Sequence, residues 1–429
     1  MSIQPRRLIG SLLVLLILLT GPESRAQPKQ IEFWWQGDLY TTRIAEQAVA
    51  AFEEAHPEVD IILRVYSNEA YKTAIQVAVA SNQPPDVFFN WAGEDTGRLV
   101  RGGLIEDLTP YAARYGWDRT LSAAALDPFR FDGRLYGAPY VIDSKYFFYD
   151  RVLFEQERIP IPRTFDALLD TCRLIRNRGL VPIAPIAFGN NERWPASHYV
   201  TLLNARFVPA PVRAQDYRLE APEAALFTHA GYTEALQVFV AMQGAGCFNE
   251  GVNAMNPEIA RALFYTEQTA MVFCGTWCFT IMDENGFKGR YALFPFPQVD
   301  GAGEDDAVIA GPNGLLISSR AREKEMAAAF IDFFLSRYNQ RRIAQESRRV
   351  PVRADALDGA QVPPMLSWAT EHLAQATHSA LWIDVKLDAT VVDTYLNAIQ
   401  EVLNRTQTPA EAIATVRRKA VDVKRRRNL

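Results

Sequence analysis

The sequence predicts an α/β protein. Strand-like and helix-like segments alternate in residues 31–91, which is typical of a parallel sheet with crossover helices. The same rhythm returns in residues 312–338. With 429 residues, of which 48% are hydrophobic and 22% charged, the chain has enough core for about two or three domains.

Residues 1–26 are expected to be a cleaved signal peptide. Arg6 and Arg7 precede the apolar run at residues 8–19, and the triplet Ser24-Arg25-Ala26 follows it, which is the pattern of a secretory signal. The run is shorter than the ~20 residues that cross a bilayer, which disfavours an uncleaved membrane anchor. The sequence therefore predicts export to the periplasm, where oxidising conditions permit disulfides.

The first folded region has three predicted strands, at residues 31–35, 59–67 and 84–91, separated by predicted helices at 41–57 and 70–83. Ligands of open parallel sheets bind beyond the carboxyl ends of the strands. The polar and aromatic residues at these ends are therefore candidate site residues: Gln36, Asp38, Asn68, Asn90, Trp91, Glu94 and Asp95.

The middle of the chain has a different pattern of predicted strands and helices. Residues 131–154 are rich in aromatic side chains and predict an extended segment that crosses the molecule. A helix capped by Thr164 is expected next, followed by strands at 181–189, 270–275 and 291–298. From about Leu366 the pattern is mostly helical.

Several function classes lack their usual signals. The net charge of −5 disfavours nucleic acid as a partner. None of the five histidines has a partner at metal-ligand spacing, and no nucleotide-binding or nucleophile motif occurs. We therefore expect no cofactor and no metal. A secreted carbohydrate-active enzyme stays open as an alternative, although no catalytic carboxylate pair stands out.

Tryptophan is the informative residue type. Five of the eight tryptophans lie at predicted strand ends or turns beside Gly, Pro, Asn or Asp: Trp34, Trp35, Trp91, Trp194 and Trp277. For each one, packing in the core is about as good an explanation as ligand binding. Taken together they favour a sugar, because flat apolar rings stack on its C–H groups while polar neighbours bind its hydroxyls.

An ordered set of motifs points to a family. They are "IEFWWQGD", "AFEEAHPEVDI", "NEAYKTAIQVAVASNQPPDVFFNWAGE", "GGLIEDLTPY", "FDGRLYGAPY", "EQTAMVFCGTW", "YALFPFPQ" and "AGPNGLLIS". This set resembles the extracellular solute-binding proteins of family 1, the sugar-binding subunits of ABC importers. The resemblance implies a two-lobe periplasmic binding protein fold with hinge strands. Lobe 1 would be residues 27–142 and 300–338, and lobe 2 residues 143–299 and 339–429.

The resemblance also implies function, partners and a site. The protein would be a monomer that captures a disaccharide or oligosaccharide between its lobes and delivers it to the permease, with no catalysis. A chemoreceptor or sensor kinase as a further partner, and a glycerol phosphodiester or other polyol as the ligand, stay open. The family's binding positions transfer to Trp35, Gln36, Asp38, Asn68, Asn90, Trp91, Glu94, Asp95, Tyr140, Asp143, Lys145, Trp194, Trp277, Asn313 and Arg349.

Four cysteines allow three complete pairings. Helical spacing would hold Cys274 and Cys278 too far apart for a disulfide, so a direct bridge between them needs an irregular turn. Cys247 lies in a loop and is the favoured partner of Cys278. Cys172 lies in a predicted helix and is expected to be a buried free thiol.

Overall fold

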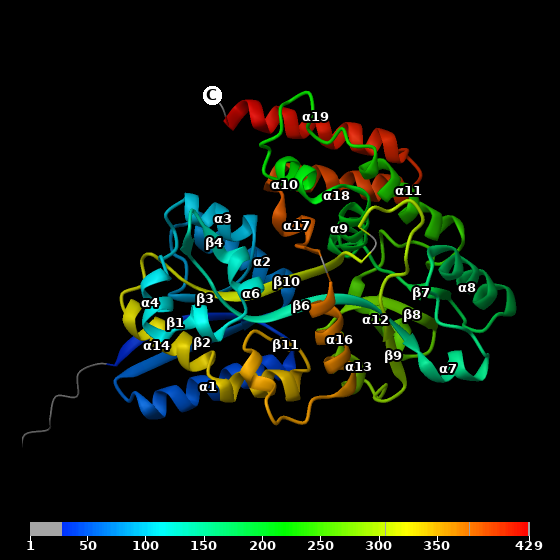
Figure 1. Ribbon diagram of the computed structural model, residues 1–429. Helices are drawn as coiled ribbons and strands as arrows, with labels where there is room; N and C mark the ends of the chain where they lie inside the picture. Colours follow the sequence, from blue (N-terminus) through cyan, green and yellow to red (C-terminus); the bar gives the residue numbers. More distant parts are fainter. Residues whose placement is uncertain (1–27, 305, 377, 428–429) are drawn as a thin grey trace, which may run out of the picture.

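The structure is a computed structural model that describes residues 28–304, 306–376 and 378–427. The predicted signal peptide lies outside these residues. Ten strands form one mixed sheet with the central order β2-β1-β3-β10-β6-β8-β7, and β9, β11 and β12 pair at its sides. Helices cover both ends of this sheet (Figure 1). None of the described helices has the length and apolarity needed to cross a bilayer.

The first region folds as the strand–helix alternation predicts. β1 (Lys29–Gln36) pairs in parallel with β2 (Val59–Tyr66) and with β3 (Val87–Trp91), and α1 (Leu39–Ala55) and α2 (Asn68–Ala80) connect them. Asp38 begins α1, because its carboxylate accepts hydrogen bonds from the backbone N–H groups of Tyr40 and Thr41.

The remaining strands are β4 (Arg130–Phe131), β5 (Arg134–Leu135), β6 (Ala138–Asp150), β7 (Ala184–Ala187), β8 (Thr269–Gly275), β9 (Tyr291–Phe294), β10 (Val308–Ile317), β11 (Val350–Pro351) and β12 (Ser379–Ala380). The remaining α-helices are α3 (Glu94–Arg101), α4 (Thr109–Tyr115), α5 (Trp117–Thr120), α6 (Ala123–Leu126), α7 (Arg151–Gln156), α8 (Phe165–Arg178), α9 (Trp194–Phe207), α10 (Ala210–Tyr217), α11 (Gly231–Gly244), α12 (Pro257–Tyr265), α13 (Cys278–Glu284), α14 (Lys324–Phe334), α15 (Arg337–Arg342), α16 (Pro364–Gln375), α17 (Ile383–Lys386), α18 (Ala389–Leu403) and α19 (Pro409–Arg427).

The buried side chains form two large clusters, one in each half of the molecule. The first contains the early strands and α14, and the second contains α8, α9, α11, α18 and α19. Two long strands join the halves (Figure 1). β6 pairs with β10 over residues 138–144 and with β8 and β9 over residues 145–150, as expected for the extended segment at 131–154.

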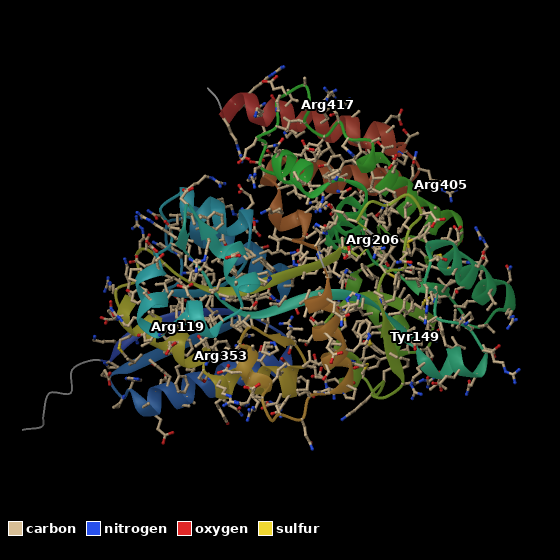
Figure 2. The ribbon with its side chains drawn as sticks, in the orientation of Figure 1. Arg119, Tyr149, Arg206, Arg353, Arg405 and Arg417 are labelled. Atoms are coloured by element: carbon tan, nitrogen blue, oxygen red, sulfur yellow. A yellow bond between two sulfur atoms is a disulfide. The ribbon has the colours of Figure 1, made fainter. Side chains whose placement is uncertain are left out.

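The core packing indicates where the chain passes from one half of the molecule to the other. Ile142 belongs to the first cluster and Phe147 to the second, close to the predicted first boundary. Along β10 the change falls between Ile309 and Ala310, about ten residues after the predicted second boundary. Residues 343–352 pack in the first cluster, although we predict them in lobe 2. In Figure 2, Arg353 and Arg119 lie in the first half, whereas Tyr149 and Arg206 lie in the second. The packing therefore favours a third crossing after Leu366.

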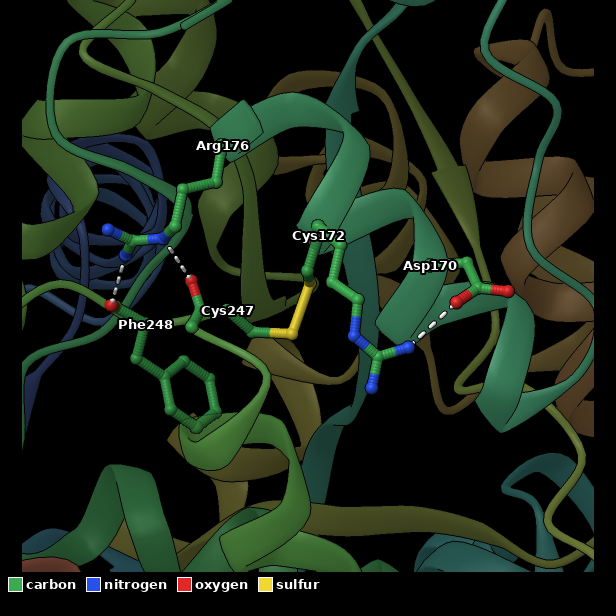
Figure 3. Close-up of a disulfide and its surroundings, with 7 residues drawn as sticks. Asp170, Cys172, Arg176, Cys247 and Phe248 are labelled. Carbon is green, nitrogen blue, oxygen red and sulfur yellow. Dashed lines mark hydrogen bonds and ion pairs between the residues drawn. A yellow bond between two sulfur atoms is a disulfide. The ribbon is translucent and has the colours of Figure 1, made fainter. Parts of the chain in front are cut away.

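The predicted cysteine pairing is wrong. Cys172 is not a free thiol: it forms a disulfide with Cys247, with Cα atoms 5.0 Å apart. Figure 3 shows this bridge between α8 and the loop after α11, which Arg176 also holds by donating to the carbonyl oxygens of Gly246 and Phe248 at 2.9 and 3.2 Å. Local sequence patterns do not indicate this contact because it joins residues 75 positions apart.

Cys278 pairs with Cys274, not with Cys247, and the Cα atoms are 6.2 Å apart. The distance limit for helical spacing does not apply here because the two residues do not share a helix. Cys274 lies in β8 and Cys278 begins α13, so the turn between them brings the side chains together. This is the irregular turn that a direct bridge requires.

Candidate ligand-binding site

A buried polar network lies where β6 and β10 join the two halves. The Asp143 carboxylate accepts hydrogen bonds from Asn313 Nδ2 at 2.8 Å and Thr276 Oγ1 at 2.7 Å. Arg349 Nη2 lies 3.2 Å from Asp143 Oδ2, and Arg349 Nη1 lies 3.7 Å from Asp38 Oδ2. The structure thus brings four predicted site residues into one network and adds Thr276.

Burial dominates the electrostatics of this network. It raises the pKa of Asp143, while Arg349 and the hydrogen bond from Thr276 oppose that rise. Burial acts to lower the pKa of Arg349, but Asp143 and Asp38 outweigh it and the pKa is raised. The guanidinium therefore stays charged, and the Asp143 carboxylate is its nearest counter-charge, while among the described residues Arg349 Nε and Asp38 Oδ2 are buried without a hydrogen-bond partner.

An aromatic cluster lies on the second half, beside this network. The ring centroids of Trp194 and Trp277 are 6.3 Å apart. Lys145 Nζ lies 5.3 Å from the Trp194 ring centroid and 5.0 Å from that of Phe273. Trp194 and Trp277 are partly exposed, so their faces are available to a ligand.

Three residues that we did not predict complete the cluster. The rings of His198 and Trp382 lie 4.3 Å apart, and Trp382 lies 6.2 Å from Trp277. Asp384 Oδ1 accepts from Ser197 Oγ at 3.1 Å and lies 3.6 Å from His198 Nε2. Burial and Lys145 lower the pKa of His198 to about 4, against the raising effect of Asp384, so this imidazole is neutral at pH 7.

The first half faces this cluster through the loop after β3. Trp91 is partly buried and packs against both core clusters, and Lys72 Nζ lies 5.8 Å from its ring centroid. α3 begins two residues after Ala92 and lies against α17. Burial raises the pKa of Asp95 to about 6, with Arg98 opposing and Asp384 of the other half adding to the rise.

The glycine before Trp277 is required by the shape of the turn. A Cβ atom on Gly275 would overlap the six-membered ring of Trp277. Thr276 N–H donates to the Ser144 carbonyl oxygen at 2.9 Å, which fixes the turn on β6. The Cys274–Cys278 disulfide closes the same turn. Position 275 therefore needs glycine because the indole lies directly over its backbone.

Six other predicted residues have local contacts of their own, and one of them, Tyr140, is close enough to Arg349, Asp143 and Asp38 for these charges to affect its pKa. Trp35 and Tyr140 are fully buried, 4.9 Å apart, in the first core. Asn68 Nδ2 donates to Glu69, and Asn90 Nδ2 donates to Thr96 Oγ1 at 3.0 Å. Glu94 forms an ion pair with Arg101, and Gln36 pairs with Tyr66 at the ends of β1 and β2. These contacts give each of the six a structural explanation, and their part in ligand binding stays a prediction.

A separate cavity of about 620 Å³ lies beside the hinge strand. Its walls include Tyr146, Phe296 and His372, and Lys145 is the single predicted site residue among its described lining. Since the tryptophans are not part of this lining, the cavity does not coincide with the aromatic cluster. Among the residues that the structure describes, no three His, Cys, Asp or Glu side chains gather as metal ligands would.

The sequence profile of the bacterial extracellular solute-binding proteins matches residues 40–341, well over half of the chain. The chain belongs to this family. An uncharacterized ABC transporter extracellular-binding protein of Pyrococcus horikoshii is 25% identical over 296 residues. The match covers 66% of this chain and 64% of that relative, so it spans slightly less than two thirds of the relative's length.

Solved structures of similar proteins agree with the fold. One, from Caldanaerobius polysaccharolyticus, was described in connection with xylan utilization and has a TM-score of 0.83 at 23% identity, covering 91% of this chain and 99% of that one. A chitin oligosaccharide binding protein has a TM-score of 0.80 at 21% identity, covering 92% and 99%. The predicted two-lobe binding protein fold is therefore confirmed, and the two core clusters correspond to its lobes. Membership of this extracellular family implies a secreted or periplasmic protein.

Proposed function

We propose that this solute-binding protein captures a disaccharide or oligosaccharide between its lobes and delivers it to the permease of an ABC importer. The observation that carries the proposal is the aromatic cluster of Trp194, Trp277 and Trp382 on one lobe, facing Trp91 and Asp95 on the other. Indole faces stack on sugar rings, and neighbouring carboxylates accept hydrogen bonds from hydroxyls. The two structural relatives described above concern xylan and chitin oligosaccharides, which supports a sugar.

The proposed site consists of the predicted residues together with four further residues. The predicted residues at its centre are Asp38, Trp91, Asp95, Asp143, Lys145, Trp194, Trp277, Asn313 and Arg349, and the additions are Lys72, His198, Trp382 and Asp384. Ligand contacts on both lobes would favour the closed arrangement, because a ligand shifts an equilibrium by its differential affinity for the two states. β6 and β10 would flex as the hinge.

Binding without turnover, a periplasmic location and a monomeric state belong to this proposal, as does docking on the permease or on a chemoreceptor or sensor kinase. A glycerol phosphodiester or another polyol is the alternative ligand. A carbohydrate-active enzyme is the alternative activity. It would need two carboxylates across the cleft at catalytic separation, and the contacts described above identify no such pair.

A thermal-shift screen tests the proposal. The mature protein is heated with neutral and acidic oligosaccharides and with a glycerol phosphodiester, since a ligand that binds the native state alone raises the unfolding midpoint. We expect at least one sugar to raise it, and the Trp277→Ala variant to lose that shift while its ligand-free midpoint stays close to wild type. A shift with the phosphodiester alone would contradict the ligand class. Released reducing ends would contradict binding without turnover.

A further inference from the structure

Lys145 is a buried cation without a carboxylate partner. Its side chain projects from β6 and the residue is 6% exposed. In the described part of the chain, its ammonium forms no hydrogen bond and no ion pair within 4 Å, and its nearest charge-stabilising contacts are the faces of Trp194 and Phe273. Cation–π contacts replace only part of the hydration that an ammonium loses on burial.

Arg261 is a second cation close to the same place. It projects from α12, its side chain is 13% exposed, and its ion pair is a 3.7 Å contact with Glu258, whose side chain is 72% exposed. Arg261 adds to the effect of burial in lowering the pKa of Lys145, with Asp384 opposing. These two largely buried basic groups therefore disfavour each other's charged form beside the tryptophan cluster, and an anion bound between them would favour the charged form of Lys145.

The nearby carboxylates are already engaged. Glu192 accepts from Trp194 Nε1 at 2.8 Å and from Asn256 Nδ2 at 2.9 Å. Asp384 is held by Ser197 and His198. Neither lies within ion-pair distance of Lys145 or Arg261, so no carboxylate of the cluster pairs with these two basic groups, and the exposed Glu258 is the ion-pair partner of Arg261.

Resting on the proposed function, we propose that the sugar bound here is acidic, with the carboxylate of a uronic acid residue placed between Lys145 and Arg261 and its ring against Trp194 and Trp277. A carboxylate carries a single negative charge and can accept charge-assisted hydrogen bonds from both Lys145 and Arg261. A phosphate monoester would bring up to two charges close to Asp384 and Asp95, which disfavours it.

The test compares each acid with its own neutral ester. Digalacturonate, glucuronosyl-xylose and their methyl esters are titrated into the mature protein, with neutral di- to tetrasaccharides and a glycerol phosphodiester alongside, and tryptophan fluorescence and calorimetry report binding. We expect an acid to bind about 10- to 100-fold more tightly than its ester, since hydrogen bonds to charged groups contribute at that level. Lys145→Met should reduce the difference to less than about threefold.

Arg261→Met gives the same test if Lys145→Met fails to fold, and the ligand-free melting temperature monitors folding. Lys29→Met is the matched control: Lys29 is half exposed, pairs with Glu323 and lies at the opposite end of β1 from the cleft, so it should keep the full preference. Equal affinity for acid and ester, or tighter binding of a neutral oligosaccharide, overturns this inference and leaves the proposed function standing. Binding of the phosphodiester alone, or of no compound, overturns the proposed function and this inference with it.

Discussion

The ion pair between Arg349 and Asp143 makes the most specific energetic prediction. We consider the substitutions Arg349→Leu and Asp143→Asn, alone and together. Both residues are buried, at 7% and 3% exposure. Removing the guanidinium leaves the carboxylate with two neutral donors, Asn313 and Thr276, whereas removing the carboxylate's charge leaves Arg349 with Asp38 at 3.7 Å.

The structure sets the size of each effect. Breaking a buried ion pair by removing one partner costs about 3–5 kcal/mol. Arg349→Leu should lie near the lower end, about 3 kcal/mol, because Asp143 keeps two hydrogen bonds. Asp143→Asn should cost about 1–2 kcal/mol, since the amide can accept from Arg349 and donate to the Thr276 hydroxyl. The double variant should lose about 2 kcal/mol less than the sum, because neither charge is then left alone.

The pH dependence of the free energy of unfolding gives an independent check on the cause of the Arg349→Leu effect. Burial raises the pKa of Asp143 and Arg349 is the largest opposing influence, so Arg349→Leu should raise this pKa further. A carboxyl whose pKa is higher in the folded state stabilises that state as it takes up its proton, and this contribution is lost as the pH rises. The stability deficit of Arg349→Leu should therefore be largest at pH 7–8 and shrink as the pH falls through the raised pKa.

Urea unfolding of the wild type, the two single variants and the double variant at several pH values measures this double-mutant cycle. Single-variant losses that add to within about 0.5 kcal/mol would show that the two side chains do not interact energetically. A deficit that grows on acidification would contradict the argument that burial of the Asp143 charge is the cause.

Other contacts of the structure make predictions about Gly275, the Cys172–Cys247 disulfide and His198. Gly275→Ala should weaken sugar binding at least tenfold in a fluorescence titration because the new methyl group displaces the Trp277 ring, and unchanged affinity would remove that ring from the site. Replacing both Cys172 and Cys247 by alanine should lower the free energy of unfolding by about 2–4 kcal/mol in urea denaturation, the usual range for a disulfide that closes a long loop, and a smaller loss would mean that α8 is held mainly by its packing. His198→Gln should reduce the loss of stability on acidification from pH 7 to 4 by about 3 kcal/mol. The buried histidine has a pKa of about 4, whereas an imidazole of the unfolded state protonates near pH 6.5, so acidification favours the unfolded state. Parallel stability–pH curves for variant and wild type would contradict that pKa.

Local patterns in the sequence predict the secondary structure well, because they report which face of an element is buried. The alternation of residues 31–91 is reproduced by β1, β2 and β3 and their connecting helices. The same period of two also explains why Trp35 is a core residue: it lies on one face of β1 with Ile31 and Phe33, which are all fully buried. Its position at a strand end made it a candidate site residue, although the alternation already indicated the inward face.

Long-range contacts were not predictable in the same way. Trp382 and Asp384 lie in a C-terminal segment without a recognisable motif, and they meet His198 because α17 packs on α9. The Cys172–Cys247 bridge likewise depends on how α8 lies beside the loop after α11. Neither contact leaves a trace in spacing or composition, since both depend on tertiary packing alone.

The turn at residues 274–278 connects the hinge to the proposed site. Thr276 donates a hydrogen bond to Asp143 on the hinge strand, while the next residue, Trp277, forms part of the aromatic wall. The Cys274–Cys278 disulfide closes this five-residue turn. Any rotation of β6 that accompanies lobe closure would therefore carry the indole with it, and a sugar stacked on that indole would act directly on the hinge strand. Binding and closure can be coupled here through one turn, with no need for a longer chain of contacts.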